Sequence, residues 1–572
     1  MEFLGKVKPE TSTERISVLV SKYDFSQPLL GKLVKIDIGS GLPTAEDGFF
    51  IVGRVVSVKT VNKAIEDPFG FISAESFDRC SVSYNDAFVS QVVGSGGFGN
   101  GSLPYLLVLD VEPITAFRNG RRDSFGYGIP VGTKVELLSN ENFSLKRYVE
   151  STAADLGVEP PPLYPIGHYI NTDIEALIDF SDFKKLGEAL HYVVAGQTGS
   201  GKSTLVQLLL AGYGLSNPDM KFVILDTVGE FRDSFKAVDS SKFINLGEVF
   251  DKSRYKIYSI PDDVALDRWE IWEELVRESR ILEKYFMIRK RENVDYAIKK
   301  IEDILKRGEL TLDGLYEAAE DGLLIATISS RVDEIVSATY KDENLQNSLR
   351  EAINMALDSR SGFLDEFKEI LKYFDNKVKY KKKVSDLVSS IFLRDDDARF
   401  FVLDMTSLSS ESMKKKVLSE IFDKIYEIVV KNRKVSNANT LIVLEEAHNW
   451  VPRRVDGNGE DAYDTDRLSN KIVKAYKELR KFGIGLMAIT TRLSGIRREI
   501  FEHSRVKIIG AGLLSGADAE LLRSEFGDEI ESIYKSFGDP RDSLSPSKQA
   551  NFLISGPITL LSRSLPEFIT VY

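Results

Sequence analysis

Cysteine is almost absent from this 572-residue chain, in which Cys80 is the single example. A disulfide within the chain is therefore impossible, and we expect a protein of the reducing cytoplasm. The four histidines are scattered along the sequence, so they form no cysteine and histidine cluster with the spacing of a zinc site. These two scarcities exclude disulfide-stapled secreted domains and zinc modules.

Long apolar runs and an excess of positive charge are also missing. No run approaches the ~20 apolar residues of a membrane span, and the first residues, MEFLGK, lack the pattern of a signal peptide. The net charge of −12 argues against a surface that coats nucleic acid indiscriminately. A small basic patch inside a ring or groove remains compatible with that charge. The length is too great for one core and predicts several domains.

The sequence GQTGSGKST at residues 196–204 has the spacing of a P-loop, in which a glycine and four residues precede Gly-Lys-Ser. Glycines allow backbone N–H groups to surround phosphate oxygens, the lysine reaches the β- and γ-phosphates, and the serine hydroxyl can bind Mg²⁺. An apolar run before it predicts a strand and one after it predicts a helix, as this site requires. The candidate nucleotide-binding residues are Gly196, Gln197, Thr198, Gly199, Ser200, Gly201, Lys202, Ser203 and Thr204.

The first 155 residues are rich in predicted strands. Residues 33–38, 49–58, 106–111 and 134–138 alternate between apolar and polar positions and are separated by glycine and proline, which predicts a small barrel. Three prolines at residues 160–162 predict a domain boundary after the barrel.

The remainder of the chain predicts an α/β domain with a mostly parallel sheet. Apolar strands at residues 221–226, 400–405, 440–444 and 485–491 alternate with helices, while residues 262–393 are mainly helical. The polar stretch 453–465 predicts a loop.

Carboxylates follow two of these strands. Glu445 and Glu446 come directly after an apolar strand, as in a Walker B motif, where one carboxylate holds Mg²⁺ and the other activates water. We assign the metal to Glu445, together with Ser203, and the attacking water to Glu446. Asp226 and Glu230 follow another strand, where either nucleotide binding or a capped, solvated turn is possible.

Arg480 stands near the end of a predicted helix. It could reach into the nucleotide site of a neighbouring subunit as an arginine finger, or it could cap the helix end as a cation. Both alternatives remain open from the residues alone.

Four stretches together resemble the HerA family of the HerA/FtsK translocases. They are the P-loop, DTVGEF at residues 226–231, EEAH at 445–448 and RKFGIGL at 480–486. The resemblance implies a RecA-like ATPase with an N-terminal barrel at residues 1–158, a core at 159–261 and 394–545 interrupted by a helical bundle at 262–393, and a C-terminal brace at 546–572.

The same resemblance implies a function and partners. It implies a homohexamer that uses ATP and Mg²⁺ to move along double-stranded DNA, and in which Arg480 acts in trans. The missing apolar run argues against a membrane-associated DNA pump. The resemblance also implies a partner docked on the barrel face. This partner would be a NurA-type nuclease in DNA-end processing, or a nuclease or sirtuin-like NADase effector in antiphage defence.

One position departs from the family pattern. Where the family has Gln-Arg-Pro after a strand, this chain has Thr491-Arg492-Leu493, so the arginine is kept and the sensor-like glutamine is replaced by a shorter threonine. Hydrolysis is therefore better supported than its coupling to movement. The alternative to a DNA motor is a ring scaffold that binds ATP to assemble and gate an effector enzyme. A metabolic kinase would need neither the barrel nor the helical insert.

Overall fold

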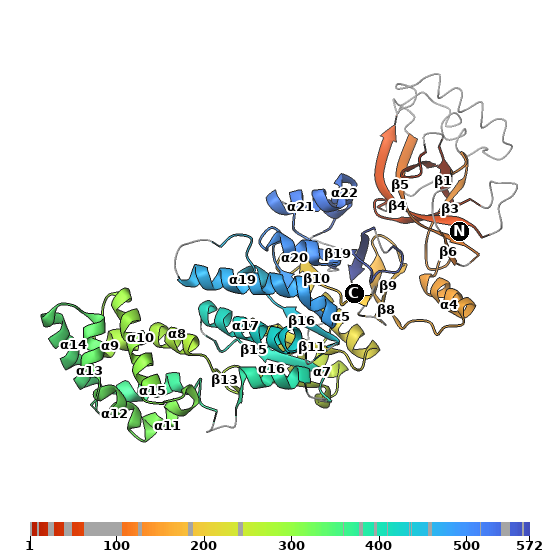
Figure 1. Ribbon diagram of the computed structural model, residues 1–572. Helices are drawn as coiled ribbons and strands as arrows, with labels where there is room; N and C mark the ends of the chain where they lie inside the picture. Colours follow the sequence, from red (N-terminus) through yellow and green to blue (C-terminus); the bar gives the residue numbers. More distant parts are fainter. Residues whose placement is uncertain are drawn as a thin grey trace.

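The computed structural model of the protein describes residues 3–8, 11–20, 28–38, 48–61, 106–119, 121–123, 128–180, 183, 187–237, 244–358, 360–376, 381–393, 397–408, 410–433, 435, 437–455, 460–514, 516–538, 550–562 and 565–571. Figure 1 shows a barrel at one end, a central sheet with helices on both faces, and a group of helices that projects from the sheet away from the barrel.

The predicted N-terminal barrel is present. Its strands follow the order β2-β1-β7-β3-β4-β5, and β5 pairs back with β2, which closes the sheet on itself. Every second residue of β2 is buried, so apolar side chains fill the interior. The strands are β1 (Phe3–Val7), β2 (Ile16–Val20), β3 (Leu33–Asp37), β4 (Phe50–Val61), β5 (Leu106–Arg118), β7 (Lys134–Leu137) and the short β6 (Arg121–Asp123), which extends from β5.

A helix, α4 (Leu145–Leu156), follows the last strand of the barrel, within the first 155 residues that the sequence predicted to be rich in strands. The Ser144 hydroxyl caps its first turn by accepting a hydrogen bond from the backbone N–H of Arg147. Gly157 ends the helix in the left-handed conformation, with φ of 66°.

The central sheet has eleven strands in the order β12-β15-β11-β16-β17-β10-β18-β19-β20-β8-β9. The run from β12 to β18 is parallel, and the strands from β19 to β9 join it in antiparallel pairs. The prediction of a mostly parallel sheet covered by helices is confirmed. The strands are β8 (Leu163–Tyr169), β9 (Glu175–Asp179), β10 (Tyr192–Ala195), β11 (Lys221–Asp226), β12 (Tyr255–Ser259), β15 (Phe400–Asp404), β16 (Thr440–Leu444), β17 (Ile484–Thr490), β18 (Val506–Gly510), β19 (Ala550–Ser555) and β20 (Glu567–Val571).

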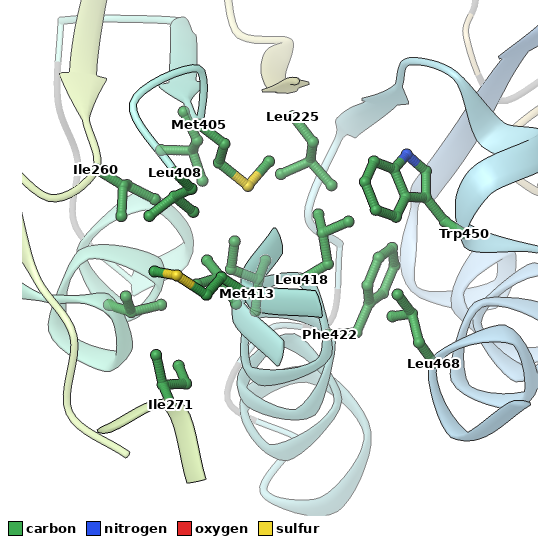
Figure 2. Close-up of a cluster of buried hydrophobic side chains, with 14 of the residues drawn as sticks. Leu225, Ile260, Ile271, Met405, Leu408, Met413, Leu418, Phe422, Trp450 and Leu468 are labelled. Carbon is green, nitrogen blue, oxygen red and sulfur yellow. The ribbon is translucent and has the colours of Figure 1, made fainter. Parts of the chain in front are cut away.

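Alternate side chains of these strands enter two separate cores, as expected for a sheet covered on both faces. Val193 of β10 packs with the helices α17 (Glu411–Tyr426) and α19 (Glu460–Glu478). Its neighbour Val194 packs in the other core with α5 (Lys202–Ser216). Figure 2 shows part of the first core, where Trp450, Phe422 and Leu468 lie together.

The helical insert leaves the sheet after β12 and returns before β15. The short parallel pair of β13 (Val264–Ala265) and β14 (Lys382–Lys383) lies at its base. Its helices are α8 (Trp269–Glu278), α9 (Ile281–Tyr285), α10 (Arg291–Arg307), η3 (Leu312–Gly314), α11 (Leu315–Glu320), α12 (Leu323–Ser329), α13 (Val332–Thr339), α14 (Glu343–Ala356) and α15 (Phe363–Leu371).

Shorter helices complete the central part. They are α6 (Glu230–Lys236), α7 (Leu246–Val249), η2 (Lys252–Arg254), α16 (Val384–Leu393), η4 (Glu427–Lys431), α18 (Ala447–Trp450), η5 (Leu479–Phe482), α20 (Arg498–His503), α21 (Gly516–Phe526) and α22 (Asp528–Lys535).

The predicted loop at residues 453–465 is wrong in its second half, because α19 already begins at Glu460. Ion pairs with other elements accommodate two acidic residues of this helix. Asp464 lies 2.7 Å from Lys416 of α17, and Asp466 lies 2.6 Å from Arg497. Its polar composition therefore reflects tertiary pairing and gives no local indication of a loop.

Candidate functional site

The glycine-rich sequence forms a loop between the end of β10 and the start of α5. Gly199 and Gly201 have φ angles of 83° and 89°, in the left-handed region that favours glycine. A Cβ atom on Gly201 would also lie 2.7 Å from the Cβ of Ala550 on β19, so the loop has no room for a side chain there. The loop is thereby fixed at the N-terminus of α5, where helix N–H groups favour an anion.

Lys202 is buried at the centre of this loop. Its ammonium donates hydrogen bonds to the carbonyl oxygens of Gly196 (2.8 Å) and Gln197 (3.0 Å). Burial lowers the pKa of Lys202, while the carboxylates of Glu446 and Glu230 act in the opposite direction. The predicted lysine and two of the predicted carboxylates therefore share one electrostatic environment.

Asp226 is fully buried at the end of β11 and caps a turn. Its carboxylate accepts hydrogen bonds from the backbone N–H groups of Gly229 (2.5 Å) and Arg232 (2.7 Å), at the start of α6. The sequence left nucleotide binding or a capped, solvated turn as alternatives for Asp226. In the structure Asp226 caps a turn, but its side chain is buried and not solvated. Glu230 follows at the first position of α6, where a negative side chain also suits the helix dipole.

Glu445 extends β16 at the same edge of the sheet, because β16 pairs with β11 from Thr440 to Leu444. The side chain is buried, and its Oε2 has no hydrogen-bond partner in the described part of the chain. Burial raises the pKa of Glu445 well above its ordinary value, and the adjacent Asp226 adds to the rise. An unpartnered carboxylate oxygen next to a second carboxylate fits a divalent cation.

Glu446 has an unusual backbone conformation for a residue with a side chain. Its φ and ψ of 46° and 45° lie in the left-handed region, and it forms the N-cap of α18. Its carboxylate Oε2 lies 3.2 Å from Nδ1 of His448. The strand end therefore separates the two neighbouring glutamates: Glu445 is buried, and Glu446 remains about one-third exposed.

The end of β17 carries the predicted pair Thr491 and Arg492. The hydroxyl that approaches His448 belongs instead to Thr490, whose Oγ1 lies 3.5 Å from Nδ1 of that histidine. Thr491 is partly buried, and Arg492 is exposed. The EEAH stretch contains His448, but the sequence assigned no role to His448 or to Thr490, since neither motif spacing nor composition indicates this contact.

Arg480 lies at the opposite edge of the sheet from the P-loop of its own chain. Its carbonyl accepts a hydrogen bond from Ala189, just before β10, whereas the P-loop follows β10. Four residues of strand separate the two edges by about 13 Å. Within the chain, its guanidinium pairs with Glu188 at 3.2 Å. The structure thus does not bring Arg480 to the other predicted residues of the same chain.

Two arginine-bearing segments lie side by side, one with Arg453 and Arg454 beyond β16 and the other with Arg497 beyond β17. Pro452 and Ile496 form an isolated bridge, and the backbone N–H of Arg453 donates to the carbonyl of Gly495 at 2.9 Å. Arg453 and Arg454 are exposed, and their side chains have no partner among the described residues. Arg497 instead pairs with Asp466 at 2.6 Å.

Two further hydroxyls lie at this edge: Ser200, which the P-loop pattern included, and Thr227, to which the sequence assigned no role. The buried Oγ of Ser200 and Oγ1 of Thr227 have no hydrogen-bond partner in the described ranges. Ser203 and Thr204 lie half-buried in the first turn of α5. The described residues hold no group of three or more His, Cys, Asp or Glu side chains arranged for one metal ion. A cation bound here would therefore need phosphate oxygens as ligands in addition to protein side chains.

Taken together, the loop, a buried lysine and carboxylates from two strand ends can bind a nucleoside triphosphate and activate a water molecule beside it. Among the helices that the structure describes, none has both the length and the apolar character needed to cross a membrane.

The chain is similar to known proteins over most of its length. Residues 164–425 match the family model of the helicase HerA central domain. The DNA double-strand break repair helicase HerA of Sulfurisphaera tokodaii is 26% identical over 380 residues, which cover 66% of this chain and 63% of that protein. The protein of the same name from Saccharolobus solfataricus is 25% identical over 349 residues, or 60% of this chain and 58% of its own. This chain thus spans less than two thirds of the length of either relative.

A solved structure, VirB4 of Thermoanaerobacter pseudethanolicus, aligns with a TM-score of 0.36 and 13% identity, covering 72% of this chain and 96% of that one.

Proposed function

The chain belongs to the HerA family of P-loop proteins, and from this premise we propose that it is an ATP-hydrolysing motor that moves double-stranded DNA through a homohexameric ring. The observation that carries the proposal is the environment of Lys202. The lysine is buried in a P-loop, and carboxylates from two neighbouring regions, Glu230 and Glu446, act on its charge. Such an arrangement suits a triphosphate whose terminal group is to be attacked by water.

Separate residues bind the phosphates, hold the metal and activate the water. Backbone N–H groups of residues 196–204 and the Lys202 ammonium bind the β- and γ-phosphates. Ser203 and Glu445 would hold Mg²⁺, for which the orphaned Oε2 of Glu445 is suited. Bound Mg²⁺ neutralises charge on the phosphates. Glu446 orients the attacking water and accepts its proton, while Asp226 fixes the turn from which Glu230 reaches the site.

Arg480 completes the site from a neighbouring subunit. Because its own P-loop lies beyond the opposite edge of the sheet, Arg480 suits a head-to-tail ring in which each subunit supplies a cation to the next. Thr491 and Arg492 follow β17 and are the expected contacts that report the state of the nucleotide.

Two features support duplex DNA as the substrate. The relatives from Sulfurisphaera and Saccharolobus are named DNA double-strand break repair helicases. The exposed side chains of Arg453 and Arg454 lie together in an otherwise acidic protein, as expected for a phosphate-binding surface inside a ring. The barrel would dock a partner, either a NurA-type nuclease in DNA-end processing or an effector in antiphage defence.

A scaffold that uses ATP to assemble and gate such an effector is the second candidate. The observation that favours it is Thr491, whose side chain is shorter than the glutamine expected at that position. This alternative predicts hydrolysis that responds to the partner and is indifferent to DNA alone.

The test is ATP hydrolysis by the purified protein with and without linear duplex DNA, accompanied by the mass of the assembly. We expect a hexamer whose rate rises with DNA. Glu446→Gln should lose roughly 100-fold or more of the rate while it still binds nucleotide, and Lys202→Ala should lose binding. A rate that ignores DNA would favour the scaffold, and a wild-type protein that is inactive with and without DNA would contradict the motor.

A further inference from the structure

Glu446 is held in a strained conformation that the surrounding structure maintains. A left-handed backbone is unfavourable for a residue with a side chain, and such strain is concentrated at functional sites. Here the left-handed conformation directs the carboxylate of Glu446 towards His448, whereas the preceding Glu445 is buried. The side chain that the carboxylate of Glu446 faces is therefore placed to control the position of that carboxylate.

His448 faces two oxygen atoms with the same ring nitrogen. Its Nδ1 lies 3.2 Å from Oε2 of Glu446 and 3.5 Å from Oγ1 of Thr490. The hydroxyl of Thr490 donates its own proton to the carbonyl of Arg492, at 3.0 Å, and accepts from the N–H of Arg492, at 3.2 Å. Thr490 has no proton left for the histidine, so Nδ1 carries the hydrogen and donates to either oxygen.

The second acceptor, Thr490, adjoins the arginine-bearing segment that follows β17. Thr490 ends β17 and bonds to Arg492 in the next turn. His448 also packs against this turn, since a Cβ atom on Gly495 would lie 3.6 Å from the Cβ of His448. The carbonyl of Gly495 in turn accepts the N–H of Arg453. One histidine thus contacts both Glu446 and the turn that supports the exposed arginines.

We propose that His448 is the positioning residue of Glu446, and that its choice between Glu446 and Thr490 links water activation to occupancy of the arginine-bearing segments by a polyanion. This inference rests on the proposed function and adds the route by which DNA would change the rate. When water attacks the γ-phosphorus, the new P–O bond forms, the bond to the β–γ bridging oxygen breaks, and Glu446 takes the proton. His448 keeps its own proton and fixes where Glu446 stands.

The test compares His448→Ala and His448→Gln with His503→Ala, a histidine on α20 that lies outside the site. The measurements are kcat and KM for ATP with and without linear duplex DNA, the Kd of a non-hydrolysable ATP analogue, and the thermal midpoint. We expect His448→Ala to lower kcat roughly 10- to 100-fold and to reduce the ratio of rates with and without DNA to about 1. Its nucleotide Kd and thermal midpoint should remain near those of His503→Ala.

His448→Gln should recover part of the rate, because its amide can donate a hydrogen bond to Glu446. Thr490→Val should lower the response to DNA more than the rate without DNA. A His448→Ala protein with wild-type kcat and a wild-type DNA response would overturn the inference, as would a loss of kcat that only follows a lower midpoint or weaker nucleotide binding. A wild-type protein that hydrolyses no ATP would instead overturn the proposed function, and the inference with it.

Discussion

Arg54 of the barrel stacks over Phe568 of the C-terminal strand β20, with its guanidinium carbon 4.8 Å from the ring centroid. The guanidinium also donates to the carbonyl of Pro566 at 2.5 Å and pairs with Glu112 of the barrel. A cation buried to this degree is retained only where charge and hydrogen bonds compensate its desolvation. Arg54 therefore joins the barrel to the sheet that carries the nucleotide site.

We expect Arg54→Met to loosen this junction, because the methionine leaves Glu112 without its partner and the Pro566 carbonyl without a donor. The cost should be about 2–4 kcal/mol. Limited proteolysis between barrel and core and the denaturation midpoint of the barrel would measure it. Arg118→Met is the matched control, since Arg118 stacks on Phe49 inside the barrel but is more than one-third exposed. Equal effects of the two substitutions would contradict a special role for Arg54.

Glu567 gives the same region a dependence on pH. Burial raises the pKa of Glu567 from 4.5 to about 7, in spite of hydrogen bonds from the Ser562 N–H and the Tyr169 hydroxyl. The folded state thus binds the proton more tightly than the unfolded chain, and the stability this proton provides is lost as pH rises from 4.5 to 7.

Glu567→Gln should abolish this loss, because the amide cannot ionise. Relative to wild type it should therefore gain stability between pH 5 and pH 8, by up to roughly 3 kcal/mol. Urea denaturation of both proteins at the two pH values measures the difference. A gap between the two proteins that stays constant with pH would show that Glu567 ionises as freely in the folded protein as in the unfolded one.

The parts of the fold that local sequence determines were predictable. Alternating strands separated by glycine and proline indicated the barrel, and apolar strands alternating with helices indicated the parallel sheet. Parallel strands end at one edge, so the carboxylates after β11 and β16 could be expected near the P-loop. Glycine spacing alone located the loop that surrounds Lys202.

The contacts that depend on long-range packing were not predictable. Thr490 and His448 are 42 residues apart, and only the register of β16 with β17 brings them together. The first turns of α19 have the composition of a polar loop because the partners of Asp464 and Asp466 lie on other elements. The capping by Asp226 depends on the turn at Gly229, where the residues alone favoured neither solvation nor nucleotide binding.

Arg480 should act on the nucleotide of a neighbouring subunit. Arg480→Ala and Lys202→Ala should each be inactive alone, the first without the finger and the second without bound nucleotide. Mixed in equal amounts, they should recover about a quarter of the wild-type ATPase rate, since random rings join an intact P-loop to an intact finger at that share of interfaces. Lys481→Ala, from the same turn, is the control and should remain active. Two inactive variants that stay inactive after mixing would indicate action within one subunit, and an active Arg480→Ala would show that Arg480 has no role in hydrolysis.

Arg453 and Arg454 should contribute charge to DNA binding, because both are exposed and their side chains have no partner among the described residues. The double variant with alanine at both positions should bind a labelled duplex more weakly, without a preference for sequence. Removing one phosphate-binding cation reduces the slope of log affinity against log salt by about 0.9, so the slope should fall by up to about 2. Fluorescence anisotropy between 50 and 200 mM salt (concentrations typical of such titrations) measures this slope.

Arg497→Ala is the matched control, since Arg497 lies in the adjacent segment but is neutralised by Asp466 at 2.6 Å, and its slope should stay near that of wild type. If Arg497→Ala changed the slope as much as the double variant, the charge that binds DNA would be spread over both segments, and the exposed pair would have no particular part in it.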